Sequence, residues 1–70
     1  SEIQTLYPQI VACTYGRAAA FRAGSEGPHE LDVVVFKVKP RSLKMADRRK
    51  IKSWLVTRTG RNNIQVFYEK

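Results

Sequence analysis

The segment that most constrains this chain runs from residue 41 to residue 60 and has the pattern of one amphipathic helix. Ile51, Trp54 and Leu55 are spaced three and four residues apart, so a helix places their side chains on one stripe. The only tryptophan of the chain belongs to this stripe. We therefore expect this helix to bury its apolar stripe and to carry the main anchor of a small core.

The ends of this helix are marked by residues that favour helix boundaries. Pro40 opposes extension towards the N-terminus, because the residue before a proline is pushed towards extended geometry. Ser42 can cap the first turn, and Arg58 in the last turn complements the negative end of the helix dipole. Gly60 can end the helix, because glycine tolerates the left-handed conformation.

The rest of the chain predicts three strands and a short first helix. A strand from Val11 to about Ala23 alternates its side chains, with Gly16 as a possible bulge, although residues 18–21 also suit a helix. The strand Leu31–Val38 is apolar on both faces, which is typical of a central strand. The remaining elements are a helix over residues 2–7, a loop over residues 24–28 and a strand over Ile64–Glu69.

This order predicts an α+β two-layer sandwich with the sequence αββαβ. The first two strands form a hairpin, and the last strand runs parallel to the second or joins the sheet beside the first. Two helices then cover one face of a three-stranded mixed sheet, and the other face stays open. Residues 1–70 make a single small domain, and the start at Ser1 rather than at methionine suggests a domain cut from a longer protein. The chain contains no run of about 18 apolar residues.

Charge is the strongest indication of a partner. The formal net charge is +7, and ten of the thirteen Lys and Arg residues lie between Lys37 and Arg61. Such a concentration suits an acidic protein, nucleic acid or an anionic membrane surface, and it also suits a helix face that is merely solvated. The single cysteine, Cys13, excludes an internal disulfide, which favours a reducing compartment, and it is expected to be a small buried residue.

Two sets of candidate contact residues follow. Arg48, Arg49 and Lys52 on the long helix are candidates for binding an anionic partner, while Phe36, Phe67 and Tyr68 are candidates for an apolar contact on the open sheet face. An uncovered edge strand also allows self-association.

No residue pattern indicates catalysis, a metal or a cofactor. Ser25, His29 and Asp32 include the residue types of a catalytic triad, but they crowd into one loop and strand start. His29 and its acidic neighbours match no zinc spacing. The loop Gly24–Gly27 has the GxxG form that clamps phosphates in KH domains, but it carries Glu26 and joins two strands. We expect no enzyme activity, no cofactor and no small-molecule substrate.

The chain resembles one bacterial family through several segments. These are Leu6-Tyr7-Pro8-Gln9-Ile10, Val33–Phe36, Leu43 with Arg48 and Arg49, Ile51–Arg58, and Ile64-Gln65-Val66. The family is the soluble tail domain of uncharacterised inner-membrane proteins that contain a multi-helix hydrophobic region. The αββαβ order also resembles BON-type domains, which are associated with membrane or phospholipid contact, although that likeness is one of topology alone.

The resemblance implies a non-catalytic interaction or regulatory domain on the cytoplasmic side of the bacterial inner membrane, as part of a longer membrane protein. Its partner is then a protein or a second copy, and an anionic membrane surface is also compatible. The concentration of basic residues agrees with a cytoplasmic location. The alternative hypothesis is a small nucleic-acid-binding module that uses the helix around residues 44–59.

Overall fold

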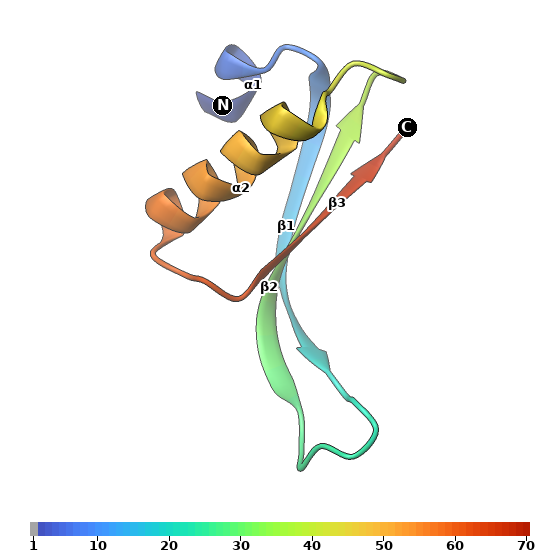
Figure 1. Ribbon diagram of the computed structural model, residues 1–70, viewed down its shortest axis with the longest axis vertical. Helices are drawn as coiled ribbons and strands as arrows, with labels where there is room; N and C mark the ends of the chain where they lie inside the picture. The colour runs from blue at the N-terminus through green and yellow to red at the C-terminus, as the bar shows by residue number, and fades with distance from the viewer. Residues whose placement is uncertain (1) are drawn as a thin grey trace.

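The computed structural model describes residues 2–70 and has the predicted α+β architecture (Figure 1). Two helices and three strands follow one another in the order αββαβ. They are α1 (Glu2–Leu6), β1 (Ile10–Ala20), β2 (His29–Val38), α2 (Met45–Thr59) and β3 (Ile64–Glu69). None of the helices described is long and apolar enough to cross a membrane.

The strands form one mixed sheet with β2 in the centre. β1 and β2 pair antiparallel as a hairpin, and β3 lies parallel to β2 on its other side. Of the two positions expected for the last strand, the structure therefore has the one beside and parallel to β2. The central position of β2 explains its run of β-branched residues, because both of its edges are paired, one face lies in the core and the valines of the other face are partly buried.

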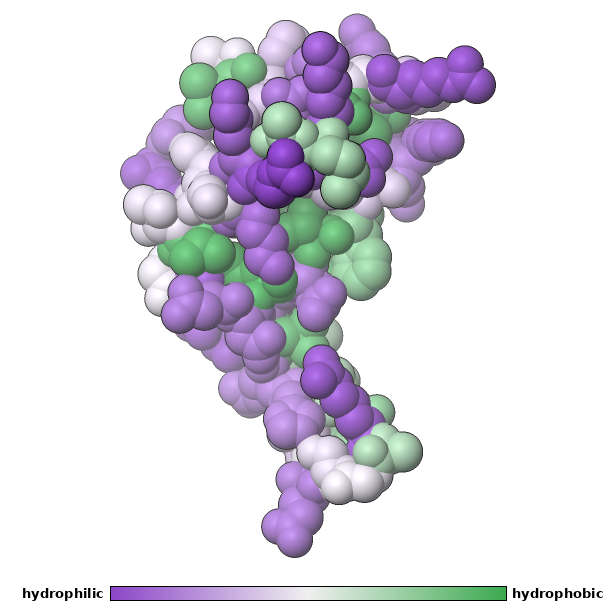
Figure 2. Space-filling model, viewed as in Figure 1, coloured by the Kyte–Doolittle hydropathy of each residue, from purple (hydrophilic) through white to green (hydrophobic). Residues whose placement is uncertain are grey.

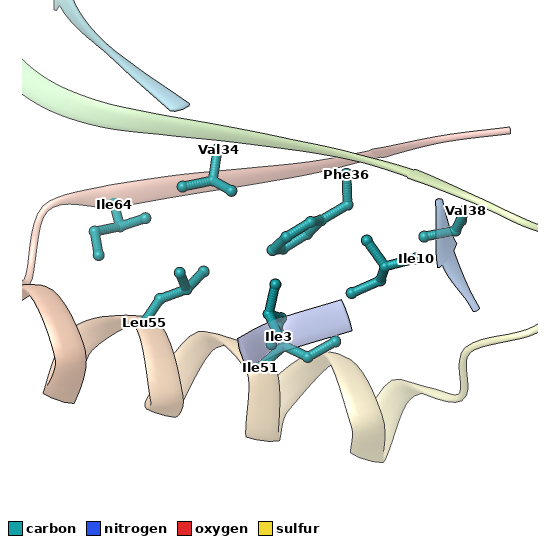
Figure 3. Packing of buried hydrophobic residues seen from close by; sticks show 8 residues of the cluster. All are labelled: Ile3, Ile10, Val34, Phe36, Val38, Ile51, Leu55 and Ile64. Atoms are coloured by element: carbon teal, nitrogen blue, oxygen red, sulfur yellow. The ribbon is translucent and has the colours of Figure 1, made fainter. Parts of the chain in front are cut away.

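Both helices contribute to the core on one face of the sheet. Figure 3 shows Ile3 of α1 and Ile51 and Leu55 of α2 pointing towards the sheet residues Val34 and Phe36. Phe36 and Ile51 are completely buried and form the centre of this cluster. The ion pair between Arg58 and Glu2 joins the end of α2 to α1. Trp54 is only partly buried against the cluster, so α2 contributes to the core as expected but mainly through Ile51 and Leu55.

The end of α2 was predicted correctly, and its beginning was not. Gly60 follows the helix with a φ of 69°, and its amide donates to the carbonyl of Val56 at 2.9 Å. The helix begins at Met45, three residues after the proposed cap at Ser42. The Ser42 hydroxyl instead hydrogen-bonds the Lys39 carbonyl in the preceding turn.

The β1–β2 hairpin extends beyond the rest of the molecule. β1 begins at Ile10 and ends at Ala20, earlier than expected, and its irregularity lies between Ile10 and Ala12 rather than at Gly16. β3 reaches only as far as Asp32 on β2, so residues 18–31 form an arm with no third strand (Figure 1). The molecule therefore measures 40 × 24 × 20 Å along its principal axes. Hydrophilic side chains cover most of the face seen in Figure 2, with apolar residues exposed where the arm joins the body.

Candidate anion-binding groove

A groove of about 470 Å³ lies between α2 and β3. Its helical wall is formed by two pairs of α2 residues one turn apart, Arg48 with Lys52 and Arg49 with Ser53. Together they form a stripe beside the buried Ile51 and Leu55. Its other wall is the edge strand β3. The lining residues are Arg48, Arg49, Lys52 and Ser53 from α2, and Gln65, Val66 and Tyr68 from β3.

The three predicted anion-binding residues are thus brought together, and Tyr68 joins them. The guanidinium carbon of Arg48 lies 4.6 Å from the centroid of the Tyr68 ring, which is a cation–π arrangement. The same ring packs against Phe36, with centroids 5.6 Å apart and planes inclined at 34°. Tyr68 therefore connects the groove to the core and holds Arg48 in place.

The groove is strongly positive. None of its lining residues is acidic. Among residues 2–70, neither Arg48, Arg49 nor Lys52 forms an ion pair with a carboxylate. The nearby Asp47 is used by the helix itself, because its carboxylate accepts a hydrogen bond from the Lys44 amide at 3.2 Å. The three cations are therefore available to an anionic ligand.

The Tyr68 hydroxyl is a second unused polar group at this place. Its oxygen is buried and has no hydrogen-bond partner among the described residues. Burial raises the pKa of Tyr68, against the opposing effect of the Arg48 charge, so the phenol stays protonated and remains a possible donor.

The predicted apolar contact residues do not form one surface. Phe36 faces the helices and is completely buried, so the prediction that it contacts a partner is wrong. Tyr68 is paired with Phe36 across β2 and β3 and lies on the same, helix-covered face. Phe67 has the opposite orientation and is 53% exposed on the open face of the sheet. The sequence could not separate these cases, because β2 is apolar on both faces.

A buried carboxylate on β2 is a feature that sequence reasoning missed. Asp32 is 2% exposed, and its oxygens lie 3.5 Å from the Arg17 guanidinium and 3.4 Å from that of Arg61. The Tyr15 hydroxyl donates a hydrogen bond to the same carboxylate at 2.9 Å, and mainly for this reason the pKa of Tyr15 is raised. The signal in the sequence was an acid within an apolar strand, because such a residue requires partners when buried.

The candidate triad residues are not assembled into a catalytic arrangement. Ser25 Oγ lies 2.6 Å from His29 Nε2, but both side chains are exposed at the tip of the arm. Asp32 is instead held by the two arginines and Tyr15. Cys13 is exposed rather than buried, and partial desolvation raises the pKa of its thiol. Within residues 2–70, no three His, Cys, Asp or Glu residues are grouped so that they could hold a metal ion.

Comparison with known proteins gives one match. The model of a family described as a domain of unknown function (DUF8492) matches residues 1–69. No curated protein and no solved structure matches the chain.

Proposed function

We propose that this chain, which belongs to the family described as a domain of unknown function (DUF8492), is a non-catalytic interaction domain that binds an acidic, extended segment of a protein partner. The groove between α2 and β3 supports the proposal, because three cations line it beside an open strand edge and have no ion-pair partner within residues 2–70.

β3 offers an unpaired backbone edge to a partner because it is the last strand in the sheet order. β3 lies at one end of the strand order, so one of its edges has no neighbouring strand among the described residues. An extended peptide can add to such an edge through main-chain hydrogen bonds, while pockets beside the edge select its side chains. Here α2 runs beside β3 and forms the second wall of the groove (Figure 1).

The α2 wall of the groove offers three positive charges to a ligand. Arg48 and Lys52 are one helical turn apart, and Arg49 is adjacent to Arg48. Guanidinium groups bind carboxylates through paired hydrogen bonds, so acidic side chains of a strand on β3 find donors within the groove.

The shape of the groove favours a peptide over single-stranded nucleic acid. A nucleic-acid-binding module needs exposed aromatic faces on which bases stack. The Tyr68 ring is covered by Arg48 and by Phe36, and the exposed Phe67 lies on the opposite face of the sheet. Nucleic-acid binding is therefore the second candidate, and it depends on the exposed cations of the basic helix alone.

The wider setting of the proposal is the cytoplasmic side of the bacterial inner membrane, within a longer membrane protein. The resemblance to soluble tail domains and the net charge of +7 support it. The test is the coding sequence around this domain, in which several apolar runs of about 20 residues are expected. A complete gene without such runs contradicts this setting but leaves the peptide-binding groove standing.

Binding is tested by titrating the ¹⁵N-labelled chain with a Glu- and Asp-rich peptide of about eight residues and following the amide shifts. We expect the shifts to cluster on α2 and β3. The double variant Arg48→Glu/Arg49→Glu should weaken binding by about tenfold or more. The matched control is Arg22→Glu/Lys37→Glu, which makes the same change of charge at exposed positions outside the groove.

Two results contradict the peptide-binding proposal. One is an equal loss of affinity in both double variants, which indicates attraction by net charge alone. The other is tighter binding of a single-stranded oligonucleotide than of the peptide, with shifts in the same groove, which makes the nucleic-acid module the better description. Vesicles containing anionic lipid provide the third arm, and binding only to these supports a membrane surface as the partner.

A further inference from the structure

We propose that β1 binds a second copy of this chain, with the two β1 strands pairing antiparallel across a two-fold axis. The sheet order is β1-β2-β3, so no strand of residues 2–70 pairs with the outer edge of β1, which at eleven residues is almost twice as long as β3. Pairing at this edge joins the two sheets into one six-stranded sheet. This surface is separate from the groove between α2 and β3, and the inference does not depend on the peptide-binding proposal.

Apart from the irregularity between Ile10 and Ala12, the β1 edge lacks the features that keep edge strands apart. Edge strands are usually protected by proline, by lysine or by charged side chains that are desolvated when another strand approaches. Ile10–Ala20 contains neither proline nor lysine, and its single charged residue is Arg17. The Arg17 guanidinium is turned to its own hairpin, where it lies 3.2 Å from Glu30 and 3.5 Å from Asp32.

Beyond the buried Ile10, both helices leave the β1 part of their own sheet face uncovered. Cys13 pairs with Phe36 and Tyr15 pairs with Val34, so the four side chains lie on the same face of the sheet. Phe36 and Val34 are in the core, whereas Tyr15 is 52% exposed and Cys13 is also exposed. A further strand beside β1 gives these side chains the cross-strand neighbours that they lack.

The charge distribution favours a second copy at this edge over any other part of the surface. The chain carries a net charge of +7, so two copies repel each other wherever their basic segments meet. Ten of the thirteen basic residues lie in residues 37–61, outside β1. The one cation of β1 is already paired with carboxylates. Self-association is therefore least opposed along this strand.

The two ends of β1 are also complementary in an antiparallel pair. An axis at Gly16, near the middle of the strand, places residue 21 of one copy opposite residue 11 of the other. Phe21 is 78% exposed and Val11 is 49% exposed. The antiparallel arrangement therefore brings Phe21 on the arm of each copy close to Val11 near the body of the other copy. The two-fold axis repeats this apolar contact, so it occurs twice in the dimer.

The oligomeric state is measured by sedimentation equilibrium of the 70-residue chain over a range of concentrations, at low salt and at about 0.5 M NaCl. We expect a monomer–dimer equilibrium that shifts towards the dimer at high salt, because salt screens the repulsion between two positive chains. Binding of an acidic peptide shows the opposite salt dependence, so the two proposals fail separately. Monomers under all these conditions overturn the inference.

The contact is located by amide hydrogen exchange of the unmodified chain at dimeric and at monomeric concentrations. Dimerisation should protect alternate amides of β1, namely those that point away from β2. Protection confined to β3 or to α2 overturns the proposed interface, whatever the oligomeric state.

The variants Ala18→Pro and Ala19→Pro provide a matched pair. Consecutive amides of an edge strand point to opposite sides, so one proline removes a hydrogen bond to β2 and the other removes only an outward donor. We expect the variant that keeps the thermal stability of the parent chain to dimerise about tenfold more weakly. Unchanged dimerisation of that variant counts against the inference, and if neither variant folds the exchange pattern of the unmodified chain decides.

Discussion

At the scale of single residues, Asp32 joins parts of the chain that are distant in sequence. Its carboxylate binds Tyr15 and Arg17 on β1 and Arg61 in the segment before β3, and its amide donates to the Asn63 carbonyl at 2.9 Å. Both edges of the sheet are thus tied to one buried residue of the central strand. The arginines keep about half of their side-chain surface exposed, which limits the desolvation cost of the cluster.

We expect Asp32→Asn to lower the free energy of unfolding by about 2 kcal/mol, because two charge-assisted contacts are lost while the buried position keeps a polar group. Urea unfolding followed by circular dichroism measures the change. Glu30→Gln is the control, because its contact with Arg17 is exposed, and it should change stability by less than about 0.5 kcal/mol. Equal effects of the two substitutions contradict this role of Asp32.

At the scale of secondary-structure elements, α2 shows what local sequence decides. Its C-terminal end at Gly60 was predictable, because the left-handed conformation strongly favours glycine. Its start was not, because the Ser42 hydroxyl bonds backwards to Lys39 and Arg41 adopts a φ of 58°, so a turn precedes the helix. Several residue types fit such a turn, and tertiary contacts choose among them.

The two glycines Gly60 and Gly16 should respond in opposite ways to alanine. Gly60→Ala places a side chain at a φ of 69° and should destabilise the chain by about 1 kcal/mol. Gly16 lies within β1 with open space around the position of an added Cβ, so Gly16→Ala should be neutral or stabilise by up to about 1 kcal/mol. Thermal melts of both variants test this pair, and a loss of stability in Gly16→Ala contradicts the open geometry at that position.

The binding residues illustrate the same division between local and tertiary information. The position of Arg48, Arg49 and Lys52 on one helix stripe follows from helical periodicity. Their meeting with Tyr68 depends on the parallel pairing of β3 with β2, for which the sequence left two possibilities. The burial of Phe36 and the exposure of Phe67 depend on which face of the sheet the helices cover, and alternation within a strand does not contain that information.

At the scale of the whole molecule, the body and the arm differ in how they are supported. The body has three strands and two helices around the buried cluster, whereas residues 18–31 have only two strands. A two-stranded ribbon without further packing is marginally stable in water. The hairpin and its connecting loop could be predicted from the order of the two strands in the sequence. The lack of cover over residues 18–31 could not, because it depends on where the pairing with β3 stops.

In the monomer, amides of the arm should exchange with solvent at least about tenfold faster than those of Val34 and Phe36. Hydrogen exchange measured at concentrations too low for self-association tests this difference. The control is the same experiment in mild urea, in which global unfolding becomes the common route of exchange and the two rates should converge. Equal protection of the arm and the body in the monomer contradicts the absence of packing around residues 18–31.

The parallel pairing of β2 with β3 has a consequence for synthesis on the ribosome. α1 and the hairpin partner of β2 precede it in the chain, but α2, which covers its core residues, and β3, which pairs with its other edge, follow it. When β2 leaves the exit tunnel, Val34 and Phe36 therefore lack the packing of Ile51 and Leu55 until at least residue 55 has also emerged. During that interval the nascent chain presents a flat apolar surface of the kind that chaperones bind, and the last turn of α2 ends it.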